Sequence, residues 1–276
     1  MRIEFTKMHG SGNDFIVVDA RDGAAVPSAE QFRRLAKRHT GIGFDQALVL
    51  EKARTPGTAI FYRIFNADGD EVEQCGNGAR CIAALLAGRD RSAPQEMTLA
   101  SAGGLVHARI QGANWVSVDM GIPSFEPSSL PFDAKARMLT YRLEVAGEDV
   151  EIGAVSIGNP HAVITVAGVA TAAVARLGPA IENHRRFPQR VNVGFMEIID
   201  RAHIRLRVHE RGAGETLACG TGACAAVAVG RQHKSLDENV QVSVRGGELR
   251  VNWVGPGKHI WLTGPAEVSF VGYFEV

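Results

Sequence analysis

Short apolar segments separated by turn residues recur along the whole chain. Apolar and polar side chains alternate over residues 59–65 and at Ile204, Leu206 and Val208, which is typical of strands with one buried face. Similar apolar runs predict further strands at 3–5, 15–19, 47–50, 97–100, 105–110, 115–119, 139–145, 150–157, 162–166, 195–199 and 268–274. We expect the last of these strands to return to the first half of the chain.

Helical spacing of apolar residues occurs in four segments. Ser28–Gln31 has the form of a capping box, and Phe32, Leu35, Ala36 and His39 follow at helical spacing, so we expect a helix here that Gly41 ends. A second helix is predicted over residues 169–181. Two segments rich in alanine and free of proline, 75–87 and 219–231, predict the other two.

Glycine and proline mark the turns between these elements. Asn66–Asp70 contains Asp-Gly and predicts a hairpin turn rather than a calcium loop, because the spacing of an EF-hand is absent. Another hairpin turn is expected near Gly246-Gly247. Residues 121–132 contain three prolines and are the best candidate for a linker. We therefore expect an N-terminal half of residues 1–120 plus 265–276 and a C-terminal half of residues 121–264.

One sequence unit occurs twice. Cys75-Gly-Asn-Gly-Ala79 and Cys219-Gly-Thr-Gly-Ala223 lie 144 positions apart, and each runs into a predicted helix. Other positions that coincide at this spacing, or at 146, are Glu71 with Glu215, Asn66 with Glu210, and Asn13 with Asn159. The chain is thus expected to be an internal duplication, with a cysteine at a helix N-terminus in each copy.

The position of these cysteines indicates acid–base chemistry. The first turn of a helix has unpaired N–H groups and a partial positive charge, which favour both a thiolate and a bound carboxylate. Such a position can lower a cysteine pKa from about 8.5 into the range of about 3.5–7.5. If two such thiols face each other, ionisation of one disfavours ionisation of the other. One base and one acid on opposite faces are what inversion of a carbon centre requires.

Other roles for the cysteines are possible from the residues alone. A small buried cysteine in an alanine-rich helix is common, although the repetition with both glycines intact argues against this for Cys75 and Cys219. Cys81 and Cys224 lie inside the helical segments and are interpreted as packing residues. The two cysteines could also form a switch disulfide, in which case the chain would be a redox protein or a binding module.

Composition narrows the function further. Hydrophobic residues make up 45% and charged residues 22% of 276 positions, as in a globular protein with a sizeable core. The 30 basic and 30 acidic residues cancel, so nothing indicates a nucleic-acid or membrane surface. We see no signal peptide and no apolar span of about 20 residues. Four cysteines without CxxC pairs indicate neither a disulfide framework nor a zinc site, and the cytoplasm is the expected compartment.

Seven motifs along the chain resemble those of the diaminopimelate epimerases, the cofactor-independent enzymes that interconvert LL- and meso-diaminopimelate. They are His9-Gly-Ser-Gly-Asn-Asp-Phe15, Gly43-Phe-Asp-Gln46, Asn66-Ala-Asp-Gly69, Cys75-Gly-Asn-Gly-Ala-Arg-Cys81, Gly158-Asn-Pro-His-Ala-Val163, Val191-Asn-Val-Gly-Phe195, and Glu210-Arg-Gly-Ala-Gly-Glu-Thr216 through Ala223. Gln46 and Thr221 stand where members of the family vary. His209 replaces an aromatic residue that is common before Glu-Arg-Gly, which concerns packing near the site.

The resemblance implies an α/β (α+β) fold of two pseudo-symmetric halves, each a mixed sheet curled around a central helix, with the active site in the cleft between them. It implies an isomerase of lysine and cell-wall precursor biosynthesis that needs neither metal nor cofactor. The family also suggests a cytoplasmic homodimer with a small-molecule substrate and no nucleic-acid or membrane partner. Closure of the halves around the substrate, with a hinge near Gly121, would exclude water.

The resemblance also implies roles for individual residues. Cys75 and Cys219 would be the two bases, assisted by His161 and Glu210 near the thiols and the substrate amine. Backbone N–H groups of Gly76, Asn77, Gly220 and Thr221 would hold the substrate carboxylate. The remaining ligands implied for the substrate are Asn13, Gln46, Asn66, Asn159, Asn192, Glu210 and Arg211.

A proline or hydroxyproline racemase is the nearest alternative, because such enzymes use the same paired cysteines. Those racemases typically have Cys-Gly-His in the first motif, where this chain has Asn77, and they lack the Glu-Arg-Gly pattern of residues 210–212.

Overall fold

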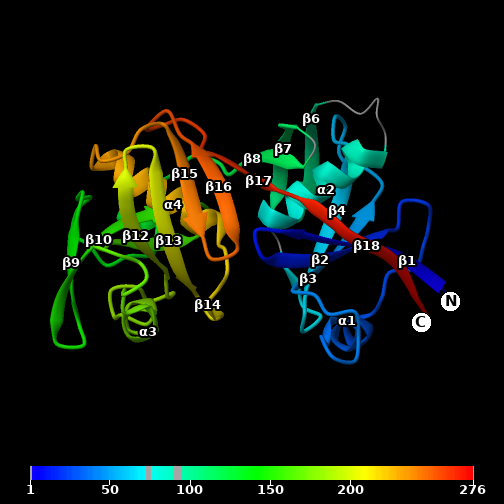
Figure 1. Cartoon of the computed structure of the whole chain (residues 1–276), viewed down its shortest axis with the longest axis horizontal. Coiled ribbons are helices and arrows are strands. Elements are labelled where there is room, and N and C mark those ends of the chain that lie inside the picture. Colours follow the sequence, from blue (N-terminus) through cyan, green and yellow to red (C-terminus); the bar gives the residue numbers. More distant parts are fainter. Residues whose placement is uncertain (1, 73–75, 90–94, 113, 276) are drawn as a thin grey trace. The chain divides into compact units, whose positions relative to one another are not determined.

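The computed structural model describes residues 2–72, 76–89, 95–112 and 114–275. The chain divides into two units, Met1–Val118 with Gly264–Val276, and Asp119–Thr263. It passes from the first unit to the second within β8 (Trp115–Asp119) and returns within β17 (Trp261–Pro265) (Figure 1). The second unit is therefore one continuous segment inserted into the first.

The first unit is a mixed sheet with helix α2 (Gly76–Arg89) against it. In pairing order its strands are β18 (Glu267–Glu275), β1 (Arg2–Gly10), β2 (Asn13–Asp19), β3 (Gln46–Glu51), β4 (Ile60–Asn66), β6 (Glu96–Ser101), β7 (Gly104–Ile110) and β8, with the short β5 (Glu71–Val72) also on β4. The pairs β2–β3 and β4–β6 are parallel and the others antiparallel. Helix α2 contacts β1 and β18 as well as β6 and β7, so the sheet curls around it.

The second unit repeats this plan around α4 (Gly220–Gln232). Its strands pair in the order β9 (Tyr141–Val145), β10 (Glu148–Ser156), β11 (Pro160–Thr165), β12 (Asn192–Asp200), β13 (His203–Glu210), β15 (Asn239–Val244), β16 (Gly247–Asn252) and β17, with the short β14 (Gly214–Glu215) on β13. Here β11–β12 and β13–β15 are the parallel pairs. Helix α4 is buried from Gly222 to Gly230 and contacts β10, β12 and β16.

The two units share their sequence of parallel and antiparallel pairs, which confirms the predicted α/β fold of two pseudo-symmetric halves. An arginine–glutamate ion pair also occurs at equivalent positions in both units. Arg63 binds Glu71 through two hydrogen bonds of 2.8 and 2.6 Å, and Arg207 binds Glu215 in the same way at 2.7 and 2.8 Å. Each pair connects a long strand, β4 or β13, to the short strand, β5 or β14, that comes next in the chain. The cysteine motif follows that short strand.

Helix α1 (Ala29–Ala36) shows what local sequence fixes and what it does not. The capping box is confirmed: the Ser28 side chain accepts from the Gln31 backbone, and the Gln31 side chain accepts from the Ser28 backbone. The predicted stop at Gly41 is wrong, because the helix ends at Ala36. The chain then folds back so that a Cβ on Gly41 would lie 2.5 Å from the Leu35 carbonyl oxygen, and this close approach is why a glycine is required there.

Helix α3 (Val174–Glu182) begins five residues later than its predicted start at 169. The backbone of Val169 is held by side chains from the sheet instead. Its N–H donates to Glu197 at 3.0 Å and its carbonyl accepts from Arg207 at 2.8 Å. Contacts between distant residues therefore override the local helical pattern.

The proline-containing segment 121–132 is packed rather than free. Pro127–Ser129 forms a 3-10 turn, and Leu130 and Phe132 belong to the buried core of the second unit. The Phe132 ring stacks on Phe187 with centroids 4.5 Å apart and meets Tyr141 edge-on at 4.8 Å. The interpretation of this segment as a linker missed these anchors, since apolar side chains between prolines are easily read as loop residues.

Other predicted turns and pairings are confirmed. Asn66–Asp70 is a hairpin turn closed by the Asn66 N–H on the Asp70 carbonyl at 2.9 Å, with Gly69 at a positive φ of 85°. Strands β15 and β16 turn between Val244 and Gly247. The last strand, β18, pairs antiparallel with β1 and so returns to the first half.

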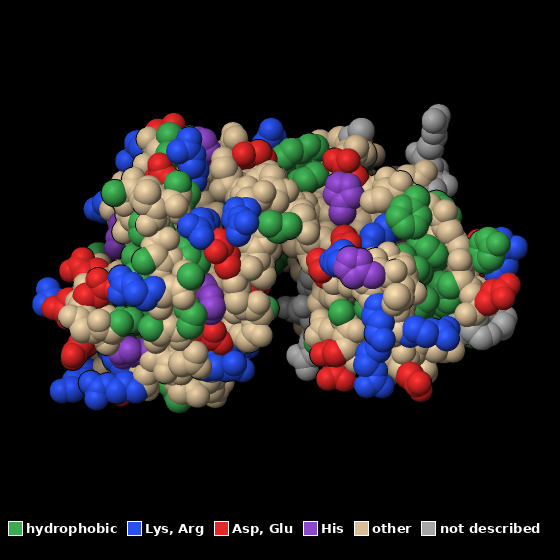
Figure 2. All heavy atoms as spheres, turned by 60° about the horizontal axis from the view of Figure 1, so that its bottom comes forward, with side chains coloured by type: hydrophobic (Ala, Val, Ile, Leu, Met, Phe, Trp, Pro, Cys, Tyr) green, Lys and Arg blue, Asp and Glu red, His purple; other side chains and the backbone are tan. Residues whose placement is uncertain are grey.

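Charged side chains of both signs intermingle over the face in Figure 2, in keeping with the balance of 30 basic and 30 acidic residues. None of the helices in the described ranges has the length and apolar character that crossing a bilayer demands.

We expect Phe132→Ala to lower the free energy of unfolding by about 3–5 kcal/mol, because it leaves a cavity beside two aromatic rings. Met138→Ala, at a side chain that is 60% exposed, is the control and should change it by less than about 0.5 kcal/mol. Urea denaturation followed by circular dichroism measures both. Equal effects of the two substitutions would contradict the packing of this segment.

Candidate functional site

Cys219 is the N-cap residue of α4 and is 5% exposed. Its side chain makes no capping hydrogen bond to the helix, so the first turn of this buried helix has no side-chain cap. A Cβ on Gly222 would lie 3.3 Å from the Cys219 sulfur and 2.9 Å from a Val208 methyl. The second glycine of the motif thus makes room for the thiol itself, a reason that the sequence pattern alone does not give.

A chain of polar contacts leads from Cys219 to His161. The Cys219 Sγ lies 3.5 Å from the Thr221 Oγ1, and Asn159 Nδ2 donates to that hydroxyl at 3.3 Å. The Asn159 Oδ1 then accepts from His161 Nε2 at 2.9 Å. The structure therefore brings four of the predicted site residues into one connected set.

Burial shifts the pKa values of the two residues at the ends of this set of contacts, His161 and Cys219. It lowers the pKa of His161 to about 3, with the positive charge of Arg211 as the second cause, so the imidazole is neutral. Burial also raises the pKa of the Cys219 thiol well above its usual range, and the nearby charge of Glu210 adds to this. The expected lowering of a cysteine pKa at a helix start is thus outweighed here by loss of solvent, and Cys219 is a thiol.

Glu210 is the last residue of β13, and Arg211 begins the turn that leads to β14. Thr216 donates to Glu210 Oε1 at 2.6 Å. The Asn192 side chain accepts from the Arg211 backbone N–H at 2.9 Å and donates to the Pro160 carbonyl at 3.0 Å. Asn192 therefore links this turn to β11, in addition to any contact with a ligand.

His209 forms a buried contact with a carboxylate that the sequence did not reveal. Its Nε2 lies 2.8 Å from Glu182, at the end of α3, and the same carboxylate accepts from the Gly212 backbone at 2.8 Å. A Cβ on Gly178 would lie 2.7 Å from the His209 ring, so that glycine admits the imidazole against the helix. The histidine in place of an aromatic residue thus fixes the Glu210-Arg211 turn through Glu182 and does more than pack.

In the first unit, Gln46 and Asn66 form a pair at opposite positions of β3 and β4. Gln46 Nε2 donates to Asn66 Oδ1 at 2.9 Å. Asn77 lies in the first turn of α2, which begins at Gly76, and its Nδ2 donates to Asn13 Oδ1 at 3.4 Å. Cys75 lies outside the described residues.

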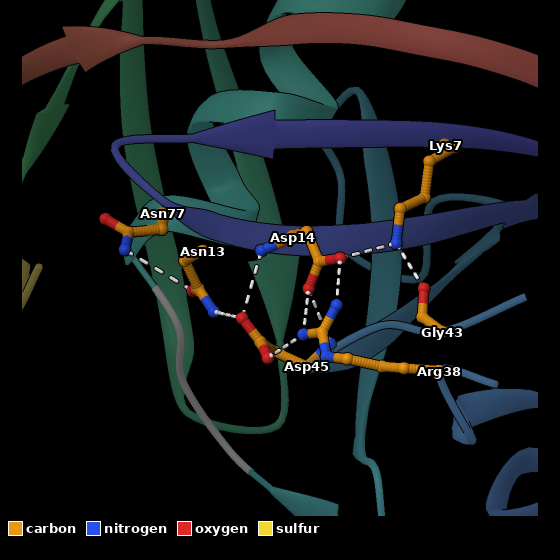
Figure 3. A network of polar contacts seen from close by, with 7 residues as sticks. All are labelled: Lys7, Asn13, Asp14, Arg38, Gly43, Asp45 and Asn77. Carbon is orange, nitrogen blue, oxygen red and sulfur yellow. Dashed lines mark hydrogen bonds and ion pairs between the residues drawn. The ribbon is translucent and has the colours of Figure 1, made fainter. Parts of the chain in front are cut away.

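Asn13 belongs to a larger network of charges shown in Figure 3. Asp14 accepts from Lys7 at 2.7 Å and from both terminal nitrogens of Arg38 at 2.9 Å. Asp45 accepts from Asn13 at 2.7 Å and from Arg38 at 2.6 Å. Asp14 and Asp45 lie within two of the quoted motifs, but sequence reasoning assigned no role to these charged side chains, because their contacts join separate segments of the chain.

The two units place equivalent asparagines beside equivalent helix starts. Asn13 contacts Asn77 at the start of α2, and Asn159 contacts Thr221 at the start of α4. The motif positions that coincide in sequence are therefore also in contact in each unit.

A family model for diaminopimelate epimerase matches residues 5–126 and 153–269. The chain belongs to the diaminopimelate epimerase family. It is 53% identical over 278 residues to the diaminopimelate epimerase of Thioalkalivibrio sulfidiphilus (strain HL-EbGR7) and 52% identical over 276 residues to that of Nitrosomonas europaea (strain ATCC 19718 / CIP 103999 / KCTC 2705 / NBRC 14298), with all of each chain covered.

Members of more distant families share the fold. A crystal structure of a hydroxyproline epimerase from Agrobacterium vitis, with bound trans-4-hydroxy-L-proline, superposes with a TM-score of 0.68 at 17% identity, covering 99% of this chain and 92% of that one. At this identity the likeness shows a shared fold only, and it does not support a racemase activity for this chain.

We expect the ring of His161 to remain neutral, with the proton on Nε2, between pH 5 and 8. Because the pKa of His161 is about 3 in the folded protein against 6.5 in an unfolded chain, its burial favours folding above pH 6.5 and opposes it increasingly as the pH falls below that value. The ¹⁵N shifts of the ring report this directly. A titration of His161 near pH 6.5 in the folded protein would contradict it.

Proposed function

We propose that this isomerase interconverts LL- and meso-diaminopimelate by a two-base mechanism without a cofactor. Support comes from membership of the diaminopimelate epimerase family and from relatives of that name at about 52–53% identity over the whole length. The observation that carries the chemistry is the buried Cys219 thiol at the uncapped start of α4. A thiol there can deliver a proton beside a site that attracts a carboxylate.

In the proposed reaction the Cys75 thiolate removes the α-proton from one face of the substrate. The Cys219 thiol delivers its proton to the opposite face, so the α-carbon inverts and the protonation states of the two cysteines are exchanged. The reverse reaction uses the opposite roles. Burial, with the nearby charge of Glu210, raises the pKa of the Cys219 thiol, which supports its assignment as the acid in this direction.

The weak acidity of the α-proton demands stabilisation of the charge that develops on the carboxylate. We propose that backbone N–H groups of Gly76, Asn77, Gly220 and Thr221 bind it, since both helices begin at these glycines. The distal end of the substrate is assigned to Asn66, Asn159, Asn192 and Arg211, with Asn13 and Gln46 completing the set of ligands. Glu210 is assigned, with His161, to the vicinity of the thiols and the substrate amine. His161, neutral and linked to Cys219 through Asn159 and Thr221, holds that chain in place.

We expect the purified protein to incorporate deuterium from solvent at the α-carbon of diaminopimelate under reducing conditions. Mass spectrometry measures the incorporation, with proline as the competing substrate. Incorporation into proline but not diaminopimelate would favour the racemase alternative, and incorporation into neither would favour the redox alternative.

Cys75→Ser and Cys219→Ser should each lower kcat by about 10²–10⁴-fold or more, because each removes one member of the acid–base pair. Cys224→Ala is the matched control, at a buried cysteine one turn further along α4, and it should retain most of the activity. Full activity of either serine variant would remove that cysteine from the mechanism.

We also propose that the enzyme is a cytoplasmic homodimer, with its thiols kept reduced in that compartment. Strand β18 supports an association through the first unit, because it exposes apolar side chains at Val268, Phe270, Val271 and Tyr273 to 49–69%. Val271→Lys/Tyr273→Lys should convert a dimer to a monomer in sedimentation equilibrium. A wild-type chain that sediments as a monomer would contradict the proposal.

A further inference from the structure

Asp45 contacts Asn13 and the charged network of the first unit at once (Figure 3). Its Oδ2 accepts from Asn13 Nδ2 at 2.7 Å and from the Asp14 backbone N–H at 3.1 Å. Its Oδ1 accepts from Arg38 Nη2 at 2.6 Å. Asp45 lies within the motif Gly43–Gln46, but the sequence analysis predicted no role for its carboxylate.

A carboxylate paired with arginine can only accept hydrogen bonds, whereas an asparagine side chain has a donor end and an acceptor end. Asn13 must therefore turn its NH₂ group toward Asp45, which leaves its Oδ1 for Asn77. Asn77 in turn presents its NH₂ group to Asn13, and Figure 3 shows its oxygen on the side away from Asn13. The directions of the Asn13 and Asn77 side chains thus follow from the charge of Asp45.

Asn77 Oδ1 is the end of this relay. Asn77 is 7% exposed, and its Oδ1 has no hydrogen-bond partner among the described residues. A buried acceptor without a partner costs free energy unless a ligand supplies a donor. The relay therefore holds an acceptor in place at the start of α2, beside the N–H groups proposed to bind the substrate carboxylate.

The charges behind Asp45 hold it in place. Arg38 bridges Asp45 and Asp14, while Lys7 contacts Asp14 from the buried side. Hydrogen bonds and charges from Arg38 and Lys7 hold the pKa of Asp14 well below its usual range against the opposing effect of burial. Two carboxylates can lie side by side here because two cations lie between and beside them.

The second unit handles the equivalent asparagine differently. The position that matches Asp45 is Val191, which is fully buried and cannot accept a hydrogen bond from a side chain. Asn159 instead accepts from His161 through its oxygen and directs its NH₂ group to Thr221 at the start of α4. The two asparagines therefore present opposite ends to their helices, an oxygen at α2 and an NH₂ group at α4.

We propose that Asp45 is a positioning residue that fixes the amide orientation of Asn13 and, through it, the Asn77 acceptor at the start of α2. This inference rests on the proposed function for its effect on turnover, while the orientation itself is a property of the folded chain. Asp45 makes the two copies of the duplicated site chemically different at this position.

Exchanging donor and acceptor tests the proposal. Asp45→Asn should lower kcat/KM by about 10–100-fold, the cost of a lost charged hydrogen bond, and Asn13→Asp should do at least the same because two carboxylates would then face each other. The double variant Asp45→Asn/Asn13→Asp restores the bond with the donor on residue 45. The kcat/KM of the double variant should recover to within about tenfold of the wild-type value.

Asp19→Asn is the matched control, because Asp19 is also a carboxylate paired with an arginine in the first unit and lies at the opposite end of β2 from Asn13. It should leave kcat/KM unchanged, and thermal unfolding should be measured on all variants. Wild-type kcat/KM in Asp45→Asn, or a double variant no better than the singles, would overturn the proposal.

A second measurement separates this inference from the proposed function. In the wild type, the side-chain NH₂ protons of Asn13 should exchange slowly with solvent by NMR, and Asp45→Asn should speed their exchange while Asp19→Asn does not. If the wild type fails to epimerise diaminopimelate, the proposed function falls and this exchange still decides the orientation. Rapid exchange of Asn13 in the wild type would overturn the inference.

Discussion

A buried helix must have the N–H groups of its first turn satisfied, and this constraint governs the site. Helix α4 is enclosed by a curled sheet, and its N-cap residue is a cysteine that provides no capping bond. The helix start is therefore suited to an anionic ligand. The same position strips water from the thiol, and this burial raises the pKa of Cys219. Carboxylate binding and proton delivery thus follow from one placement.

The two units share a fold that arose by duplication, and they differ in the residues that contact their equivalent asparagines. The Arg63–Glu71 and Arg207–Glu215 pairs show that the copies keep the same connection before each cysteine motif. The positions equivalent to His161 and Asp45 hold Phe15 and Val191, all four in or beside the strands next to the helix start. Each unit therefore stabilises its asparagine with a different partner, one by an imidazole and one by a carboxylate.

The sequence was informative wherever a local rule decides the structure. The capping box at Ser28, the turn at Gly69 and the duplicated glycine motifs each depend on neighbours within a few residues. Motif resemblance also grouped Asn159, His161 and Thr221 with Cys219, and the structure connects these four residues through polar contacts.

The remaining features depend on residues far apart in the chain. The start of α3 is decided by Glu197 and Arg207, and the His209 contact by Glu182. Asp45 joins segments that share no motif, so its role emerged only from the three-dimensional network. The protonation of Cys219 likewise depends on the depth of burial, which a helix-start rule does not include.

The pairing of β18 with β1 has a consequence for synthesis on the ribosome. The first unit lacks strand β18 until residues 267–275 leave the exit tunnel, whereas the second unit, residues 119–263, is complete earlier. The usual order of folding, in which the N-terminal domain finishes first, is therefore reversed here. Until β18 emerges, β1 has an open edge, and nascent chains stalled at this stage are the species most exposed to mispairing.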